Sequence, residues 1–388
     1  MVTIDNAQNA LKDAYLDVVS EALNIKANPL LARIKQTSND VWGKEIIKLT
    51  TFGVNGGVGA GTETGALPES AGNNYVKFVA SLKNLYGVIE ISDKAIRASE
   101  SNAGAFVNLL NAEMEGLIKA SNFNFSRMLF GDGTGKLADV SAIAATNVTV
   151  GSVKNLMEGQ MVQLFKTGNS VASLTARITK IDRANKKVYL SESNSITMGN
   201  DTYYLAMQNS LNQEITGLGA IFDDSITSLY GVTKADYSWM SPVKKTASDG
   251  KLTEDLMQNC IDDIDEIGGS VVDYITCSND VRRIYQKLLT ACRSNIDVMD
   301  LQGGFKALSY NGIPVVNDRF VADGTMYLLS TKDFELHQLC DWRWLEDEGG
   351  KIIRQKPGYP AYTATLVKYA DLICSKPCGQ AKIIGITK

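Results

Sequence analysis

A glycine-rich stretch near the N-terminus has the residue types of a phosphate-binding loop. Residues 50–74 contain seven glycines, two glutamates and no Lys or Arg. Such a loop needs the pattern G-x-x-x-x-G-K-[ST], because backbone N–H groups surround the phosphates and the lysine reaches them. Gly56 and Gly61 have this spacing, but Thr62 and Glu63 follow them, and a glutamate repels phosphate. The stretch therefore lacks the groups that would hold a nucleotide.

Two further glycine patterns fail for similar reasons. The dinucleotide pattern G-x-G-x-x-G meets Thr62 in one register and Thr64 in the other, where its last glycine should stand. In residues 131–137, GDGTGKL, the phosphate-loop spacing would place Phe130 at the first glycine and Leu137 at the Ser/Thr position. We predict no cofactor at either segment.

The titratable residues give no pattern typical of catalysis. His337 is the only histidine, which excludes a multi-histidine metal site or a two-histidine mechanism within one chain. We expect it to pack at the end of a strand. The acidic run at residues 262–266 contains an isoleucine that belongs to an apolar face, so it is interpreted as the solvated face of a helix. We predict no catalytic residue and no metal site, and therefore a protein that is not an enzyme.

Cysteines and tryptophans allow one further interpretation each. The six cysteines are scattered through a long chain, which indicates reduced thiols in a cytoplasmic setting. Trp342 and Trp344 lie two residues apart and hence on one face of a strand. Such a pair could stack on a base or a sugar, but packing in a core or between subunits is favoured.

Composition describes a folded soluble protein of two or three domains. The chain has 388 residues, 44% of them hydrophobic and 21% charged. Its net charge of −4 gives no global basic surface for nucleic acid, although a local one is possible. No apolar run approaches the roughly 18 residues that span a bilayer, so no membrane association is predicted.

The elements around the glycine-rich stretch predict a long protrusion. Residues 5–23 have helical periodicity. A short strand, residues 45–52, leads into the stretch, and an alternating apolar pattern beginning at residue 74 leads out of it. About 25 irregular residues between two strands are unusual inside a compact domain, so this segment is expected to be functional.

The rest of the chain divides into three segments by its expected secondary structure. Residues from about 102 to 130 keep a helical spacing of apolar positions, which predicts a rod of about 40 Å. Residues 147–211 read as short strands with a hairpin turn at 183–186, typical of a small β-barrel or β-sandwich inserted into a larger body. Residues 212–388 mix helices and strands.

This order of parts resembles the major capsid protein of tailed bacteriophages, whose fold is shared with encapsulin shells and the herpesvirus capsid floor. Three phrases carry the resemblance: ALPESAGN, GLGAIFDDSITSLYGVTKADYSWMSP and GGFKALSYNGIPVVNDRFVADGTMYLLSTKDFELHQL. It implies an α+β fold with an N-terminal arm, a long hairpin called the E-loop, a spine helix, peripheral and axial domains, and an inserted β domain. The implied boundaries are 1–35 for the arm, 36–92 for the hairpin with its tip at about 50–76, 93–146 for the peripheral domain, 147–211 for the insertion, and 212–388 for the axial domain with return strands to the peripheral domain.

The resemblance also implies where subunits touch. The E-loop is expected to reach over an adjacent subunit, and the N-terminal arm to clasp another. The E-loop residues expected at contacts are Phe52, Gly57, Gly61, Glu63, Leu67, Pro68 and Glu69. The residues of the N-terminal arm that are expected at contacts are Leu11, Tyr15, Pro29 and Leu30.

The implied function is a shell of hexamers and pentamers, icosahedral or prolate, around double-stranded DNA, assembled in the bacterial cytoplasm and found in the virion. A portal at one vertex and non-specific DNA contacts are implied partners. One branch of the family cross-links its shell through an E-loop lysine, but residues 49–76 contain no lysine, so contacts are expected to be non-covalent. The chain begins almost directly with the N-terminal arm, so a separate scaffolding protein, or none, is expected.

Two alternative functions remain open from the sequence. An encapsulin-type compartment shell has the same fold and differs in its contents. A carbohydrate-binding or virion decoration protein is the alternative from another class, and it rests on the inserted β domain and the tryptophans.

Overall fold

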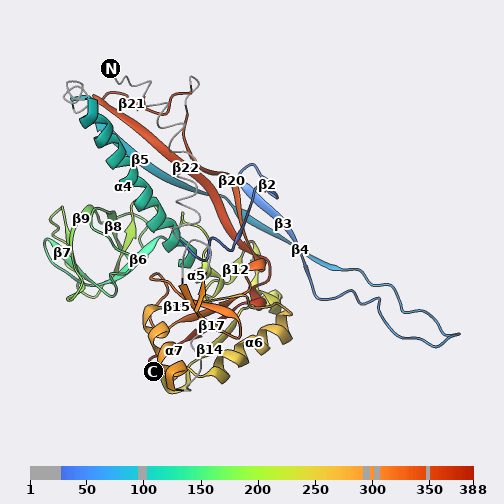
Figure 1. Ribbon diagram of the computed structural model, residues 1–388. Coiled ribbons are helices and arrows are strands. Elements are labelled where there is room, and N and C mark those ends of the chain that lie inside the picture. The colour runs from blue at the N-terminus through green and yellow to red at the C-terminus, as the bar shows by residue number, and fades with distance from the viewer. Residues whose placement is uncertain (1–27, 95–102, 292–297, 301–305, 347–349) are drawn as a thin grey trace.

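The computed structural model describes residues 28–94, 103–291, 298–300, 306–346 and 350–388. It contains an elongated body made of a long helix against a long sheet, a β-barrel, and a compact domain of sheet and helices (Figure 1). One hairpin extends far beyond all three. None of the helices in these ranges is both long and apolar enough to cross a membrane.

A five-stranded sheet, the central sheet, joins distant parts of the sequence. Its longest strand, β22, pairs antiparallel on one side with β5 and on the other with β20. The short strand β1 runs parallel to β20, and β21 pairs with β22. The bounds are β1 (Lys35–Thr37), β5 (Lys83–Ser92), β20 (Phe334–Trp344), β21 (Arg354–Gln355) and β22 (Ala361–Cys374).

The long helix α4 (Ala103–Phe130) lies along this sheet (Figure 1). It agrees with the helix predicted over 102–130. Strand β5 alternates strictly between exposed and buried residues and turns its buried positions towards the core. Gly87 is one of these positions, and a Cβ atom there would lie only 2.9 Å from Cδ1 of Leu117 on the helix. Glycine at this position allows helix and strand to approach closely.

The predicted protrusion is a hairpin of β3 (Glu45–Phe52) and β4 (Asn74–Ser81), with β2 (Val41–Trp42) beside β3. Residues 53–73, here called the arm, continue beyond the paired strands and project away from the body (Figure 1). The predicted hairpin range of 36–92 was too long, because β5 pairs with β22 and belongs to the central sheet. Both β4 and β5 alternate between buried and exposed residues, so the pattern gave no sign of the change of partner.

The inserted domain is a closed six-stranded barrel in the order β10-β7-β6-β11-β8-β9. Its strands are β6 (Lys136–Ile143), β7 (Asn147–Val150), β8 (Met161–Lys166), β9 (Leu174–Asp182), β10 (Lys187–Leu190) and β11 (Tyr203–Met207). The predicted turn at 183–186 joins β9 to β10. The predicted start at residue 147 was too late, because β6 pairs with both β7 and β11 and closes the barrel.

The third body is a seven-stranded mixed sheet, the seven-stranded domain, with helices α6 (Glu254–Gly268) and α7 (Asn279–Ala291). Its strands are β14 (Val243–Thr246), β15 (Tyr274–Cys277), β16 (Val298–Asp300), β17 (Lys306–Tyr310), β18 (Ile313–Asn317), β19 (Met326–Leu329) and β23 (Ala381–Ile384). Between β19 and β23 the chain leaves for the central sheet, where it forms β20, β21 and β22. This path agrees with the return strands expected within 212–388.

Short elements link the bodies. The segment that follows the barrel contains α5 (Leu218–Ile221) and a small two-stranded sheet of β12 (Ser228–Leu229) and β13 (Val232–Thr233).

Helix α6 begins after Thr253, whose side chain accepts a hydrogen bond from the Leu256 N–H at 3.1 Å. It ends at Gly269, which has a φ of 56°. These are the expected start and stop signals of a helix.

The first described residues belong to the body and not to a free arm. Leu30, Leu31 and Ile34 are buried in the main core, and the Asn28 side chain accepts a hydrogen bond from the Leu30 N–H at 2.9 Å. The predicted N-terminal arm, residues 1–35, therefore includes residues that pack inside the subunit. The helix expected over 5–23 lies outside the described residues.

Candidate intersubunit arm and its anchoring joint

The arm carries apolar side chains that no other part of the described structure covers. Val54, Val58 and Leu67 are 86%, 87% and 89% exposed. Single exposed apolar residues are common on protein surfaces, but here three lie on a segment that makes few contacts with its own body (Figure 1). Burying such side chains against another surface is favourable by about 25 cal/mol per Å² of apolar area. The arm therefore has the properties of a contact segment.

The backbone of the arm is also largely unpaired. Within residues 53–73, the bond from the Gly65 N–H to the Thr62 carbonyl, 3.1 Å long, is the only backbone–backbone hydrogen bond. The two limbs lie close where glycines face them: a Cβ on Gly59 would sit 3.2 Å from Cγ of Pro68. Free N–H and C=O groups on an extended segment can pair with a strand of another chain.

Most E-loop residues expected at contacts are accessible. Five of them are exposed, and Gly57 is half-buried. The five are Gly61, Glu63, Leu67, Pro68 and Glu69. Their role in contacts between subunits stays a prediction.

Phe52 has a different environment from the one expected. Its ring stacks on Trp239 at 5.6 Å between centroids and meets Tyr237 edge-on at 5.5 Å. Phe78, on the opposite strand of the hairpin, is fully buried and lies 5.9 Å from Trp239 and 5.4 Å from Tyr230. These contacts are made within the subunit, so Phe52 anchors the base of the hairpin. Sequence reasoning missed the three aromatic partners, because they lie more than 140 residues away and follow no periodic pattern.

The residues expected to contact a neighbour through the N-terminal arm are less accessible. Leu11 and Tyr15 lie outside the described residues. Pro29 is half-buried, and Leu30 is 1% exposed in the main core. In this conformation Leu30 has no surface to offer a neighbouring subunit, which corrects its assignment.

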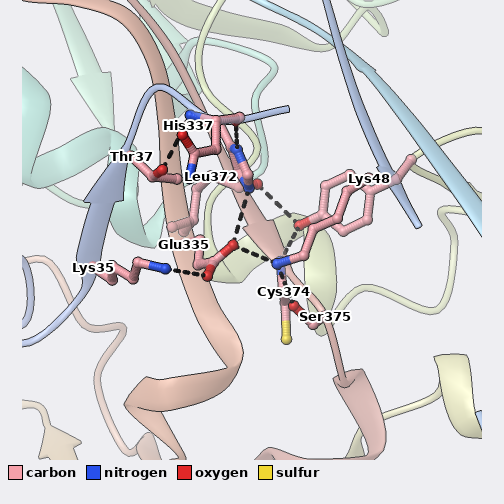
Figure 2. Close-up of polar contacts among 10 residues, drawn as sticks. Lys35, Thr37, Lys48, Glu335, His337, Leu372, Cys374 and Ser375 are labelled. Carbon is pink, nitrogen blue, oxygen red and sulfur yellow. Dashed lines mark hydrogen bonds and ion pairs between the residues drawn. The ribbon is translucent and has the colours of Figure 1, made fainter. Parts of the chain in front are cut away.

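A polar cluster, the joint, holds the N-terminal strand and the hairpin base to the central sheet (Figure 2). Glu335 on β20 accepts hydrogen bonds from Lys35 on β1 at 3.2 Å and from Lys48 on β3 at 2.5 Å. Lys48 also donates to the Ser375 hydroxyl at 2.9 Å, just after β22. One carboxylate thus links three segments that are up to 300 residues apart in sequence.

His337, the single histidine, completes the joint and is fully buried. Its Nδ1 lies 2.9 Å from the Asn39 carbonyl, and its Nε2 lies 3.3 Å from Oε2 of Glu335. Burial lowers the pKa of His337, and the Asn39 contact only partly opposes this effect. A carbonyl oxygen can only accept, so Nδ1 carries a hydrogen and donates it to Asn39. The residue is packed as expected, but it lies within β20, where it pairs with Thr37 and Asp371, and not at the strand end.

The joint should make the subunit less stable in acid. Burial alone would raise the pKa of Glu335, but Lys48 and Lys35 outweigh it and hold that pKa below its usual 4.5. The His337 pKa also lies below its usual 6.5. When a folded-state pKa is lowered, the unfolded chain binds the proton more readily, so stability falls as pH falls. We expect the contribution of the joint to the urea midpoint to decrease from pH 7.5 to 4, beginning near pH 6.5.

The variant His337→Asn isolates the histidine contribution. Asparagine places an amide N–H near the position of Nδ1 and does not titrate in this range. The difference between variant and parent should therefore shrink as pH falls from 7 to 5. This comparison is needed because Asp371 and Asp318 act with opposite sign: burial raises the pKa of each to about 6. A parallel pair of pH profiles would contradict the assignment to His337.

The tryptophans that suggested ligand stacking are part of the core. Trp342 and Trp344 are 5% and 3% exposed, and the Trp342 ring meets Phe125 of α4 edge-on at 6.1 Å. Buried rings have no free face for a sugar or base. One of the two features behind the carbohydrate-binding alternative, the tryptophan pair, therefore no longer supports it, while the inserted β domain is present as the barrel.

No protein-family model matches this sequence, and no curated protein matches it. Solved structures do resemble it. The capsid of cyanophage A-1(L) matches with a TM-score of 0.55 and 12% identity, over 95% of this chain and 92% of that one. The SrpI encapsulin of Synechococcus elongatus PCC 7942 has a TM-score of 0.49 and 10% identity, over 93% and 89%. The capsid of Myoviridae phage XM1 has a TM-score of 0.46 and 10% identity, over 92% and 90%.

The chain has the phage major capsid fold. The fold class expected from the sequence is confirmed, with a closed barrel as the inserted domain. In the vocabulary of this fold, the arm is the tip of the E-loop, α4 is the spine helix, and the seven-stranded domain is the axial domain. The ring cluster of Phe52, Phe78, Tyr230, Tyr237 and Trp239, here called the aromatic anchor, lies where the E-loop leaves the subunit body. The joint lies in the same region.

Proposed function

We propose that this protein is the major capsid protein of a tailed bacteriophage, which forms hexamers and pentamers of a closed shell around double-stranded DNA. The observation that carries the proposal is the arm. It combines three uncovered apolar side chains with an unpaired backbone on a segment that projects from a well-packed body (Figure 1). Such a segment gains its contacts only in an assembly.

The division between a rigid body and an adaptable arm suits a closed container. The same chain must occupy slightly different environments in hexamers and pentamers, so the connections between subunits have to adapt while the subunit keeps its shape. Glycines let the arm change conformation, and its low charge lets it lie on a neighbour without burying unpaired ions. The aromatic anchor and the joint fix the direction in which the arm leaves.

Further partners follow from the same proposal. We expect a portal at one vertex, a separate scaffolding protein during assembly in the host cytoplasm, and DNA contacts with phosphates that carry no sequence information. The contents distinguish this proposal from an encapsulin-type shell, which would enclose protein cargo.

Electron microscopy of the purified chain tests the proposal directly. We expect closed particles of uniform size, and particles from infected or expressing cells should protect DNA from nuclease. Particles that hold a specific protein and no nucleic acid would favour the encapsulin alternative. A monomer or small oligomer by light scattering, under all conditions that keep the chain folded, would contradict a shell protein of either kind.

A further inference from the structure

The barrel differs in charge from the rest of the chain. Residues 136–207 contain eight basic and five acidic residues, a net charge of +3, whereas the whole chain carries −4. Four of the basic residues are paired within the described structure: Lys136 with Asp139, Lys154 with Asp323, Lys166 with Asp201, and Arg183 with Glu158. The excess positive charge therefore resides on the other four.

These four residues all lie on the β9–β10 hairpin, and they define the basic hairpin. They are Arg177, Lys180, Lys186 and Lys187. All are exposed, and none forms an ion pair with another described residue. Lys180 lies 5.6 Å from the centre of the Tyr189 ring on the paired strand. Asp182 lies on the same hairpin and offsets one of these four charges.

Helix α6 has the opposite character. Its 15 residues include six acids and no Lys or Arg. One of them, Asp263, pairs with Lys245 at 2.5 Å. The other five are exposed and fall within about 120° of the helix circumference at 100° per residue: Glu254, Asp255, Asp262, Asp265 and Glu266. At the C-terminal end of the helix and just after it, Ile267 and Val271 are 62% and 75% exposed, and Ile267 lies outside this acidic face.

The two surfaces match in length and lie on opposite flanks of the subunit. From Arg177 to the end of β9 the strand spans about 17 Å, and from Glu254 to Glu266 the helix spans about 18 Å. Helix α6 lies on the side of the seven-stranded domain that faces away from the barrel (Figure 1), so the two surfaces do not meet within one chain. Complementary patches on opposite flanks produce a head-to-tail contact, which closes into rings or continues through an array.

We propose that the basic hairpin of one subunit docks on the acidic face of α6 of a second copy. The inference rests on the proposed shell function and identifies one of its contacts. Exposed ion pairs are individually weak, but complementary charges select the partner and its orientation, and a shell repeats the contact many times.

Charge reversal and charge swap test the contact. The variant Lys180→Glu/Lys187→Glu should raise the protein concentration needed for assembly by about tenfold or more, because attraction becomes repulsion. Adding Asp262→Lys/Glu266→Lys to the same chain should restore assembly to near the parent level. Higher salt should weaken assembly of the parent, since exposed charges are screened over about 10 Å at 0.1 M.

A matched control is Lys287→Glu/Lys332→Glu, which changes net charge equally at two exposed lysines of the seven-stranded domain. It should assemble like the parent. Circular dichroism must show that all variants are folded. If the hairpin variant assembles normally, or if the swap fails to restore it, the proposed contact is wrong. Normal shells that protect less DNA would instead assign the hairpin to nucleic acid. Failure of the unmodified chain to assemble would overturn the shell function itself.

Discussion

Deletion of residues 54–72 should abolish closed shells and leave a folded subunit. The removed segment contains the three uncovered apolar side chains and makes few contacts with its own body. Its loss takes away the surface that a neighbour would cover. We expect electron micrographs without particles and light scattering that shows monomers or small oligomers.

The structure provides a clean junction for this deletion. The paired strands end at Phe52 and Asn74, which are partners in the ladder. Joining Gly53 to Asn73 creates a two-residue Gly-Asn loop, which suits a type II′ hairpin turn. A shorter loop also loses less entropy on closure. The melting temperature should stay within about 2 °C of the parent, because roughly 1 kcal/mol shifts it by only about 1 °C in a chain of this size.

A full-length variant separates the apolar contacts from the length of the arm. Val54→Ser, Val58→Ser and Leu67→Ser together keep the backbone and remove the apolar side chains. We expect assembly only at higher protein concentration, because backbone pairing with a neighbour remains possible. Normal shells from the deleted chain would show that the arm is not a necessary contact, and the proposal for it would fail.

Glu214→Gln should destabilise the subunit by about 3–5 kcal/mol in denaturant unfolding. Glu214 forms an ion pair with Arg127 at the end of α4, and their side chains are only 2% and 4% exposed. Removing one charge leaves the other buried without a partner, and the cost of that desolvation is large. Among the described residues, the Nε atom of Arg127 already lacks a hydrogen-bond partner.

This pair also holds two parts of the fold together. Arg127 lies just before the barrel and Glu214 just after it, 87 residues further along the chain. The ion pair therefore closes the neck from which the barrel emerges. We expect the variant to increase hydrogen exchange at residues 208–222 before it affects the barrel strands.

Two further variants serve as controls for the loss of stability expected from Glu214→Gln. Glu158→Gln breaks the exposed pair with Arg183 and should cost less than about 1 kcal/mol. The double variant Arg127→Met/Glu214→Leu should recover most of the stability, because apolar residues of similar size can replace a buried pair. A loss below about 1 kcal/mol for Glu214→Gln would mean that water reaches the pair.

Local patterns in the sequence determined a large part of the architecture. Helical spacing gave α4 nearly to the residue, and the turn at 183–186 separated β9 from β10. The missing lysine and the wrongly placed threonines removed nucleotide binding from the glycine-rich stretch and left a flexible, weakly charged arm. These features depend on neighbours within a few residues, so a single sequence contains them.

Only the tertiary structure decided which surfaces are free. Phe52 and Leu30 read as possible contacts, yet the first stacks on Trp239 and the second lies in the core. Strand β5 alternates like β4, so periodicity could not show that β5 belongs to the central sheet. Strand β6 lacks a regular alternation, so its place in the barrel depends on its partners β7 and β11. The joint and the Arg127–Glu214 pair connect residues 87 to 300 positions apart. Contacts over such distances arise when the chain folds back on itself, and local spacing does not encode them.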